Sequence, residues 1–178
     1  MRAAVMCTRY TFGMSSPLHS DLLGGLPPVL DQRTRILILG SFPGVASLAA
    51  AQYYAHPRNQ FWPLLSAVLD LPLATLPYPQ RLDMLLDAGI GLWDVIDHCR
   101  RKGSLDSAIR DSRSNNFTHL QSASPDLVRV CFNGKTSGKF APEFIKAGYQ
   151  TLILPSSSPA NAQSTFAQKL AIWRGIIG

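Results

Sequence analysis

The chain has 178 residues, with 17 Lys and Arg against 11 Asp and Glu, and a formal net charge of +6. Hydrophobic residues make up 46% and charged residues 16%, a balance that excludes both a disordered chain and a simple polycation. The length suits one folded domain, and the basic excess favours a polyanionic partner.

The three cysteines, Cys7, Cys99 and Cys131, lie far apart in the sequence. Without a Cys-x-x-Cys pair they predict no structural zinc site, and three thiolates are too few for an ordinary iron–sulfur cluster. No apolar run approaches the roughly 18 residues of a membrane span, and the N-terminus lacks a signal-peptide pattern. We therefore expect a cytoplasmic, bacterial-type protein without cofactor or metal, with a flexible extension at 1–24 and one domain at 25–178.

From Leu26 onward, short apolar runs alternate with amphipathic segments. After an extended lead-in at 26–30, runs closed by Gly or Asn predict strands, and segments with a 3.6-residue period predict helices. The predicted strands are 35–39, 92–96, 127–132 and 151–154, and the predicted helices are 61–69, 79–88, 140–147 and 164–177. This alternation indicates a three-layer α/β/α fold around a short, mainly parallel four-stranded sheet.

Ligands of such sheets bind beyond the carboxyl ends of the strands, which directs attention to four loops. These loops are 40–59, 94–104, 133–139 and 155–161. The first opens with a tight Gly-x-x-Pro-Gly turn that fits neither a Walker loop nor a GxGxxG motif. It continues as YYAHPRNQFW, in which aromatic rings beside a cation and an amide suit a pocket that stacks a flat base and hydrogen-bonds its edge.

Four motifs follow one another along the chain: GSFPG at 40–44, YAHPRNQFW at 54–62, FNGK at 132–135 and LPSSSPANA at 154–162. Over residues 26–178 they resemble the uracil-DNA glycosylase superfamily, especially the mismatch-specific uracil and thymine glycosylases with their GxNPG and FAHPxNRFW patterns. Phe42 replaces the Asn of the first motif, Tyr54 replaces the stacking Phe, and PSSSPAN forms the second motif. With GLWDVIDHCRRKGSLDSAI at 91–109, this set is similar to the deoxyinosine (hypoxanthine)-DNA glycosylase family.

The resemblance implies a monofunctional glycosylase of base excision repair that flips a deaminated base, most of all hypoxanthine, out of the duplex and hydrolyses its N-glycosidic bond. The implied partner is double-stranded DNA containing a deaminated base, and we expect a monomer acting at the nucleoid. A glycosylase for uracil or thymine in G mismatches is one alternative, which Phe42 disfavours. A non-catalytic damaged-DNA-binding module, disfavoured by Asn59, and a small-molecule hydrolase are others.

In this family the resemblance assigns water positioning to Asn59, with Ser41 as the second candidate. Phe42 has no side-chain group that hydrogen-bonds water, so the role of the missing Asn must move or be absent. An Asn just before a helix also suits a helix cap, and both interpretations of Asn59 stay open.

The resemblance also implies that Phe42, Tyr54, Asn133 and Asp94 bind the base. Tyr54 would stack on it, Asn133 would hydrogen-bond its edge, and the Asp94 carboxylate would accept the N1–H of hypoxanthine. The structural alternatives are a core aromatic at Tyr54, a left-handed turn at Asn133 and a buried acid paired with an Arg at Asp94. Phe42 either narrows the pocket or wedges into the DNA.

Contacts with DNA phosphates are expected from hydroxyls, free backbone N–H groups and cations near the same edge. The candidates are Ser156, Ser157, Ser158, Asn161, His56 and Arg58. A structural role is the alternative for His56. The basic run at 100–102 also suits phosphate contact, with a solvated face as its alternative.

Overall fold

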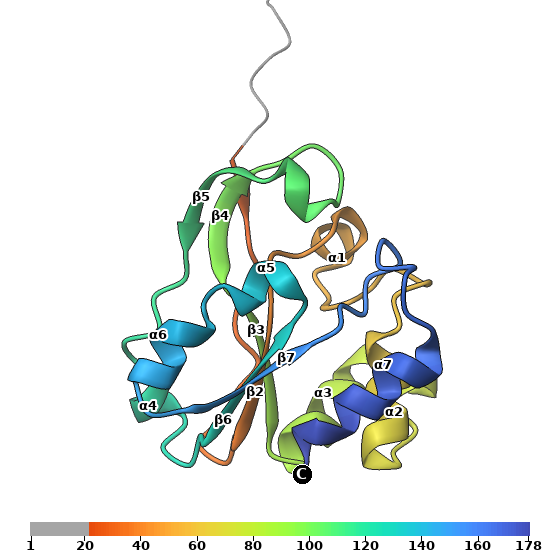
Figure 1. The fold of residues 1–178 in the computed structure, drawn as a ribbon, viewed down its shortest axis with the longest axis vertical. Coiled ribbons are helices and arrows are strands. Elements are labelled where there is room, and N and C mark those ends of the chain that lie inside the picture. Colours follow the sequence, from red (N-terminus) through yellow and green to blue (C-terminus); the bar gives the residue numbers. More distant parts are fainter. Residues whose placement is uncertain (1–21) are drawn as a thin grey trace, which may run out of the picture.

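A computed structural model describes residues 22–178 and confirms the predicted α/β/α layers (Figure 1). The central sheet has four parallel strands in the order β3-β2-β6-β7. Their bounds are Ile36–Gly40 for β2, Ile90–Asp94 for β3, Arg129–Asn133 for β6 and Gln150–Leu154 for β7. β3 lies two residues earlier than predicted, because the chain leaves the sheet directly after Asp94.

Helices cover both faces of this sheet (Figure 1). One face packs against α2, α3 and α7, and the other against α4, α5 and α6. These helices are α2 (Phe61–Leu69), α3 (Tyr78–Asp87), α4 (Leu120–Ala123), α5 (Lys135–Gly138), α6 (Ala141–Lys146) and α7 (Phe166–Trp173). The 3₁₀ helices η1 (Leu73–Thr75) and η3 (Arg174–Ile176) adjoin α2 and α7.

Each face of the sheet has its own apolar core, because side chains alternate along a strand. Ile38 of β2 faces the core under α2 and α7, whereas Leu37 and Leu39 face the core under α6. All three are fully buried, which is what the continuous apolar run of this strand predicts.

A second, antiparallel sheet in the order β1-β4-β5 was not expected from the sequence. Its strands are Leu23–Gly24 (β1), Ile96–Arg100 (β4) and Arg110–Ser114 (β5). β5 reads RDSRS and is exposed throughout, so it carries no apolar alternation that would reveal it. Since β1 begins at Leu23, the domain starts earlier than the predicted 25; the rest of the predicted extension, residues 1–21, lies outside the described residues.

Two short helices also stand where loops were predicted. α1 (Val45–Ala50) follows the GSFPG turn, and α5 follows Gly134. With six and four residues they are too short to produce a periodic pattern.

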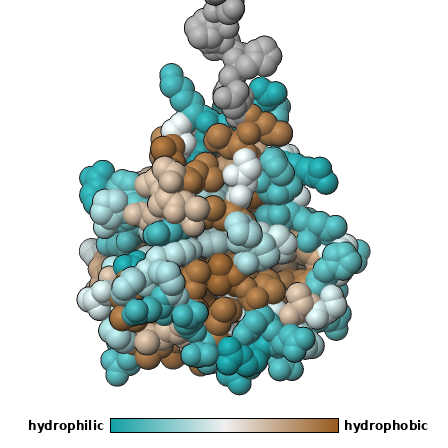
Figure 2. Space-filling view, turned by 180° about the vertical axis from the view of Figure 1, so that it is seen from behind, coloured by the Kyte–Doolittle hydropathy of each residue, from teal (hydrophilic) through white to brown (hydrophobic). Residues whose placement is uncertain are grey.

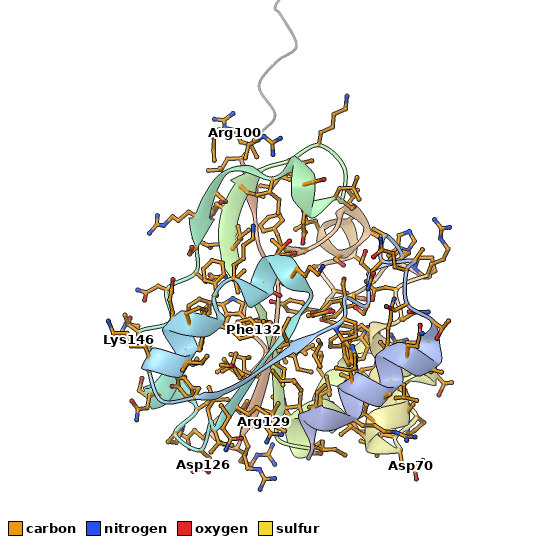
Figure 3. The ribbon with its side chains drawn as sticks, viewed as in Figure 1. Asp70, Arg100, Asp126, Arg129, Phe132 and Lys146 are labelled. Carbon is orange, nitrogen blue, oxygen red and sulfur yellow. The ribbon has the colours of Figure 1, made fainter. Side chains whose placement is uncertain are left out.

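The amino-terminal end of the sheet is fixed by Arg129, at the opposite end of the molecule from Arg100 (Figure 3). The Arg129 guanidinium donates to Gln150 Oε1 and to the carbonyls of Gly175 and Ile176. This clamp holds the C-terminal turn against β6 and leaves the other end of the sheet to the loops.

The face seen from behind is hydrophilic around its margin, with apolar surface near its middle (Figure 2). Within residues 22–178, no helix has the length and hydropathy needed to cross a bilayer.

Phe144 provides a test of the core under α6. Its ring is 4% exposed and contacts Phe117, Phe132 and Tyr149, so Phe144→Ala should leave a cavity and lower the free energy of unfolding by about 3–5 kcal/mol. Urea denaturation followed by tryptophan fluorescence measures the loss. The neighbouring Ile145 is 58% exposed, and Ile145→Ala should change the stability by less than about 1 kcal/mol; equal losses in both variants would contradict this packing.

Candidate active site

The carboxyl ends of the four parallel strands meet at one edge of the sheet. Gly40 lies opposite Asp94, and Asn133 lies opposite Leu154. After β2 the chain first adds β3 on one side of it and then adds β6 and β7 on the other side. The edge between β2 and β6 is therefore the topological switch point, where open α/β sheets bind their ligands.

Gly40 allows the chain to come unusually close to Asp94. A Cβ atom at this position would collide with Asp94 Oδ1 and would lie 3.1 Å from the Tyr54 hydroxyl. The first Gly of GSFPG is thus required because two polar groups crowd the end of β2.

Asp94 is a buried carboxylate, 3% exposed, and its Oδ2 has no hydrogen-bond partner among residues 22–178. Burial raises the pKa of Asp94 to about 7, the charge of Asp106 adds to the rise, and Arg101 opposes it. No ion pair joins Asp94 to an Arg within the described chain, so the alternative of a paired buried acid is wrong. An unpartnered buried carboxylate indicates a site that awaits a donor from outside.

Tyr54 lies over the same edge, with its hydroxyl buried and without a partner among the described residues. Its backbone φ is 55°, a left-handed conformation that a non-Gly residue rarely adopts. One face of its ring stacks on Phe61, with the centroids 3.6 Å apart and the planes 10° apart. Burial first and the Asp94 charge second raise the pKa of Tyr54, which keeps the hydroxyl protonated and able to donate.

Asn133 connects β6 to the PSSSPAN loop through both ends of its amide. Nδ2 donates to Ser157 Oγ, and Oδ1 accepts from Ser157 N, each over 2.9 Å. The left-handed φ of 107° belongs to Gly134 and not to Asn133, so the turn interpretation of Asn133 is wrong. Asn133 also lies near enough to Tyr54 to lower the pKa of that hydroxyl, which places its amide close to the Tyr54 side chain.

The PSSSPAN loop is held by its own polar groups. Ser156 Oγ accepts from Ser158 N over 3.2 Å, and Asn161 Nδ2 donates to the Ser156 carbonyl over 3.1 Å. Three residues of this loop are half-buried, namely Ser156, Ser158 and Asn161. Their contact with DNA phosphates remains a prediction. Ser157 is fully buried against Asn133, so in this conformation its hydroxyl positions the loop and does not reach a phosphate.

A buried lysine, which the sequence analysis did not single out, joins this loop to the YAHPRNQFW segment. Lys169 is 2% exposed, and its Nζ donates to Gln60 Oε1 over 2.8 Å and to the Asn161 carbonyl over 3.0 Å. Gln60 N in turn donates to the Ser157 carbonyl over 3.0 Å. These bonds hold two loops, a hundred residues apart in sequence, at a fixed separation.

The N-cap of α2 is Gln60, which makes no side-chain cap bond, so the prediction that Asn59 holds the cap position is wrong by one residue. Asn59 instead satisfies the first N–H of the helix from the preceding position, a contact here called the cap contact. Its Oδ1 accepts from Phe61 N over 3.0 Å, while Nδ2 makes no hydrogen bond among residues 22–178. The preceding turn is closed by His56, whose Nδ1 accepts from Arg58 N and whose carbonyl accepts from Asn59 N. The cap contact and the catalytic role are compatible, because they use different atoms of the amide.

Phe42 is 6% exposed and belongs to the core under α6, so it does not wedge into DNA. Arg101 explains its burial: the guanidinium lies 5.0 Å from the ring centroid and donates to the Pro43 carbonyl. Arg101 is itself 6% exposed, with Nε and Nη1 unpartnered among the described residues. The basic run is therefore divided, because Lys102 is exposed and Arg100 lies 3.5 Å from Asp111.

Residues 101–109, here called the strap, fold back onto the GSFPG turn. Ser41 Oγ donates to Asp106 Oδ1 over 2.7 Å, and Val45 N donates to Ser104 Oγ over 3.0 Å. Asp106 opens the 3₁₀ helix η2 (Asp106–Ala108). The sequence analysis missed it, because one acid in a loop gives no signal of a contact 65 positions away.

The burial of the Asp94 charge can be tested by measuring how the free energy of unfolding depends on pH. Burial raises its pKa from 3.8 to about 7, so the folded state holds this proton more tightly than the unfolded chain. Its contribution to the free energy of unfolding is greatest below about pH 4 and is lost as the pH rises through 7. Relative to the native chain, Asp94→Asn should gain about 2–3 kcal/mol of stability between pH 5 and pH 8, measured by urea denaturation.

Asp111→Asn is the control for this measurement, because the Asp111 side chain is 74% exposed. Its free energy of unfolding should lie within about 1 kcal/mol of the native value. A constant difference between Asp94→Asn and the native chain across this range would contradict the buried, unpartnered charge.

The comparisons with known proteins agree with this geometry. The family model for the uracil DNA glycosylase superfamily matches residues 27–176. Two relatives, each named hypoxanthine DNA glycosylase, are 46% identical over 82% of this chain and 92% of the Methanosarcina barkeri protein, and 44% identical over 77% of this chain and 87% of the Methanosarcina acetivorans protein.

A solution NMR structure from Methanosarcina acetivorans, provisionally named as a uracil DNA glycosylase, matches with a TM-score of 0.78 and 38% identity over 89% of this chain and all of that one. The match in fold thus extends over nearly the whole described chain. With a family model over most of its length and relatives above 40% identity, the chain belongs to the uracil DNA glycosylase superfamily.

Proposed function

We propose that this protein is a DNA glycosylase that hydrolyses the N-glycosidic bond of deoxyinosine in duplex DNA and releases hypoxanthine. The carboxylate of Asp94, buried and unpartnered at the end of β3 beside the last residue of β2, is the observation that carries the proposal. The relatives named hypoxanthine DNA glycosylase support it, since they align with this chain over most of their own length. We further propose that the enzyme acts as a monomer.

Base recognition follows from the donors and acceptors at the pocket edge. Hypoxanthine presents an N1–H donor beside its O6 acceptor, and an ionised Asp94 accepts the former. The second hydrogen of Asn133 Nδ2, beyond the one given to Ser157, is available for O6. Phe61 supports one face of the Tyr54 ring, which leaves the other face for the base.

Hydrolysis requires water at the sugar carbon C1′ while the base departs with the electron pair of the broken bond. Asn59 Nδ2, unoccupied by the cap contact, holds this water in the proposal, and Ser41 supplies a second polar contact. Phe42 excludes bulk solvent from beneath the GSFPG turn, since it is buried under Arg101.

DNA binding draws on the net charge of +6 and on polar groups near the pocket. Arg58 is exposed beside the half-buried His56, and the hydroxyls of Ser156 and Ser158 lie along the stiff loop. These groups suit the phosphates around an extruded nucleotide. A weakly paired deoxyinosine costs less to extrude than a Watson–Crick base.

One feature favours a second substrate. A carboxylate that accepts the N1–H of hypoxanthine also accepts the N3–H of uracil, so deoxyuridine is the nearest competitor.

The substrate proposal is tested on duplexes that each carry one deoxyinosine, deoxyuridine, deoxyxanthosine or G·T mismatch. Abasic sites are detected by alkaline cleavage. We expect deoxyinosine to be processed fastest. Faster cleavage of deoxyuridine would transfer the assignment to uracil, and binding of all four duplexes without any cleavage would favour a damage-binding module.

The role of Asn59 is tested with variants that separate its two functions. Asn59→Ala removes both the cap contact and the amide, whereas Asn59→Ser keeps an oxygen for the Phe61 N–H. Both should lower the single-turnover rate on deoxyinosine about 100-fold, and Asn59→Ser should keep a thermal midpoint near that of the native chain. Asn116→Ala, at an exposed amide bonded to Thr118, should remain fully active. Native activity in Asn59→Ser would reduce Asn59 to its cap contact.

A further inference from the structure

Hydrolysis of a glycosidic bond releases a proton from the attacking water, and Asn59 and Ser41, the two residues that contact this water in the proposed function, offer no base for it. An amide such as Asn59 positions water but accepts no proton at neutral pH. Phe42 occupies the motif position of a polar residue and is buried in the core. Asp94 is committed to the base in the proposed function, so the proton acceptor must come from elsewhere.

Asp106 places a carboxylate beside the end of β2 from the 91–109 segment, outside the four motifs at 40–44, 54–62, 132–135 and 154–162. Its Oδ1 accepts from Ser41 Oγ over 2.7 Å, directly after Gly40. The strap is fastened beside this contact by the bond from Val45 N to Ser104 Oγ and by Arg101, which donates to the Pro43 carbonyl. Three residues of the strap therefore hold the GSFPG turn.

The charge of Asp106 acts on the buried polar groups of the candidate site. It raises the pKa of both Asp94 and Tyr54, which requires that it lie close to these buried groups. Asp106 is half-buried, and its Oδ2 makes no hydrogen bond within residues 22–178. One carboxylate oxygen is thus fixed by Ser41, and the other is open to a water molecule.

We propose that Asp106 is a catalytic residue, the general base that takes the proton of the attacking water; the inference rests on the proposed function. In this step the water oxygen bonds to C1′ as the C1′–N9 bond breaks. The electron pair of that bond leaves with N9 of hypoxanthine, and one water proton passes to Asp106 Oδ2. Ser41 is the positioning residue, because its hydroxyl holds Oδ1 and orients the open oxygen.

Asp106→Asn distinguishes catalysis from a structural contact, because the amide oxygen still accepts from Ser41 while the basic oxygen is lost. We measure the single-turnover release of hypoxanthine from a deoxyinosine duplex and, separately, the affinity for a duplex carrying a tetrahydrofuran abasic analogue. The rate should fall at least about 100-fold, with the affinity and thermal midpoint close to native. Ser41→Ala should lose about tenfold in rate.

Asp111→Asn is the charge-matched control, since it also removes one negative charge from the neighbouring antiparallel sheet. It should keep rate and affinity within about threefold of native. Asp106→Ala adds a readout that a structural role would not produce: sodium formate should restore part of its rate, and sodium chloride at equal concentration should not.

Asp106→Asn with a rate within threefold of native would overturn the proposal, as would an Asp106→Ala variant that formate does not rescue. A loss of rate matched by an equal loss of affinity or of thermal stability would assign Asp106 a structural role and also overturn it. If the native protein releases no base from any duplex, the proposed function fails, and this inference fails with it. If the native enzyme and Asp106→Asn are equally active on deoxyinosine, the proposed function stands and only the role of Asp106 is contradicted.

Discussion

The candidate site depends on one close approach, between the last residue of β2 and a carboxylate at the end of β3. Gly40 permits it, because any side chain there would collide with Asp94. Burying Asp94 without a partner costs stability, and burial raises its pKa to about 7. A fold that keeps such a group at the ligand-binding edge of its sheet has retained it for a partner from outside. The N1–H of an extruded base is a donor of the right kind.

The remaining walls are held by polar contacts between segments far apart in sequence. Asn133 fixes Ser157, Ser157 accepts from Gln60, and Lys169 joins Gln60 to Asn161. Because these side-chain bonds are partly buried, the PSSSPAN loop and the YAHPRNQFW segment form one rigid unit. In the proposed function this unit holds an extruded nucleotide without reorganising, which lowers the entropic cost of reaching the transition state.

The sequence predicted the parallel sheet well, because its strands are buried on both faces and read as continuous apolar runs. The start of α2 could be predicted because a proline is tolerated only in the first turn of a helix, and Pro63 therefore requires the helix to begin just before it. The antiparallel sheet was missed, since β5 is exposed and carries no pattern. The burial of Phe42 and Arg101 was missed for a different reason. A basic run in a loop suggests exposure to solvent, and only the tertiary structure shows that the Arg101 guanidinium lies over the buried ring of Phe42.

Site residues within motifs were found from the sequence, whereas residues that act across the fold were not. Asp94 and Asn133 end strands of the sheet, where the topology directs attention, and Tyr54 was identified by its position in the YAHPRNQFW motif. The partners of Asp106 and Lys169 lie 65 and 109 positions away, and no local pattern encodes such contacts. The same difference between local and distant contacts explains why Asn59 had two interpretations. Its contact with Phe61 N is local and can be predicted from the sequence, whereas the availability of its Nδ2 depends on the surrounding loops.

The pairing of Asp94 with the base edge is the centre of this account, and one measurement tests it directly. Single-turnover rates are compared for duplexes containing deoxyinosine or 1-deaza-deoxyinosine, which has the same shape but lacks the N1–H donor. The native enzyme should process the deaza base at least about tenfold more slowly, and this difference should shrink in Asp94→Asn, since the two changes remove the same hydrogen bond. Equal rates on the two bases, or an undiminished difference in Asp94→Asn, would contradict the role given to Asp94.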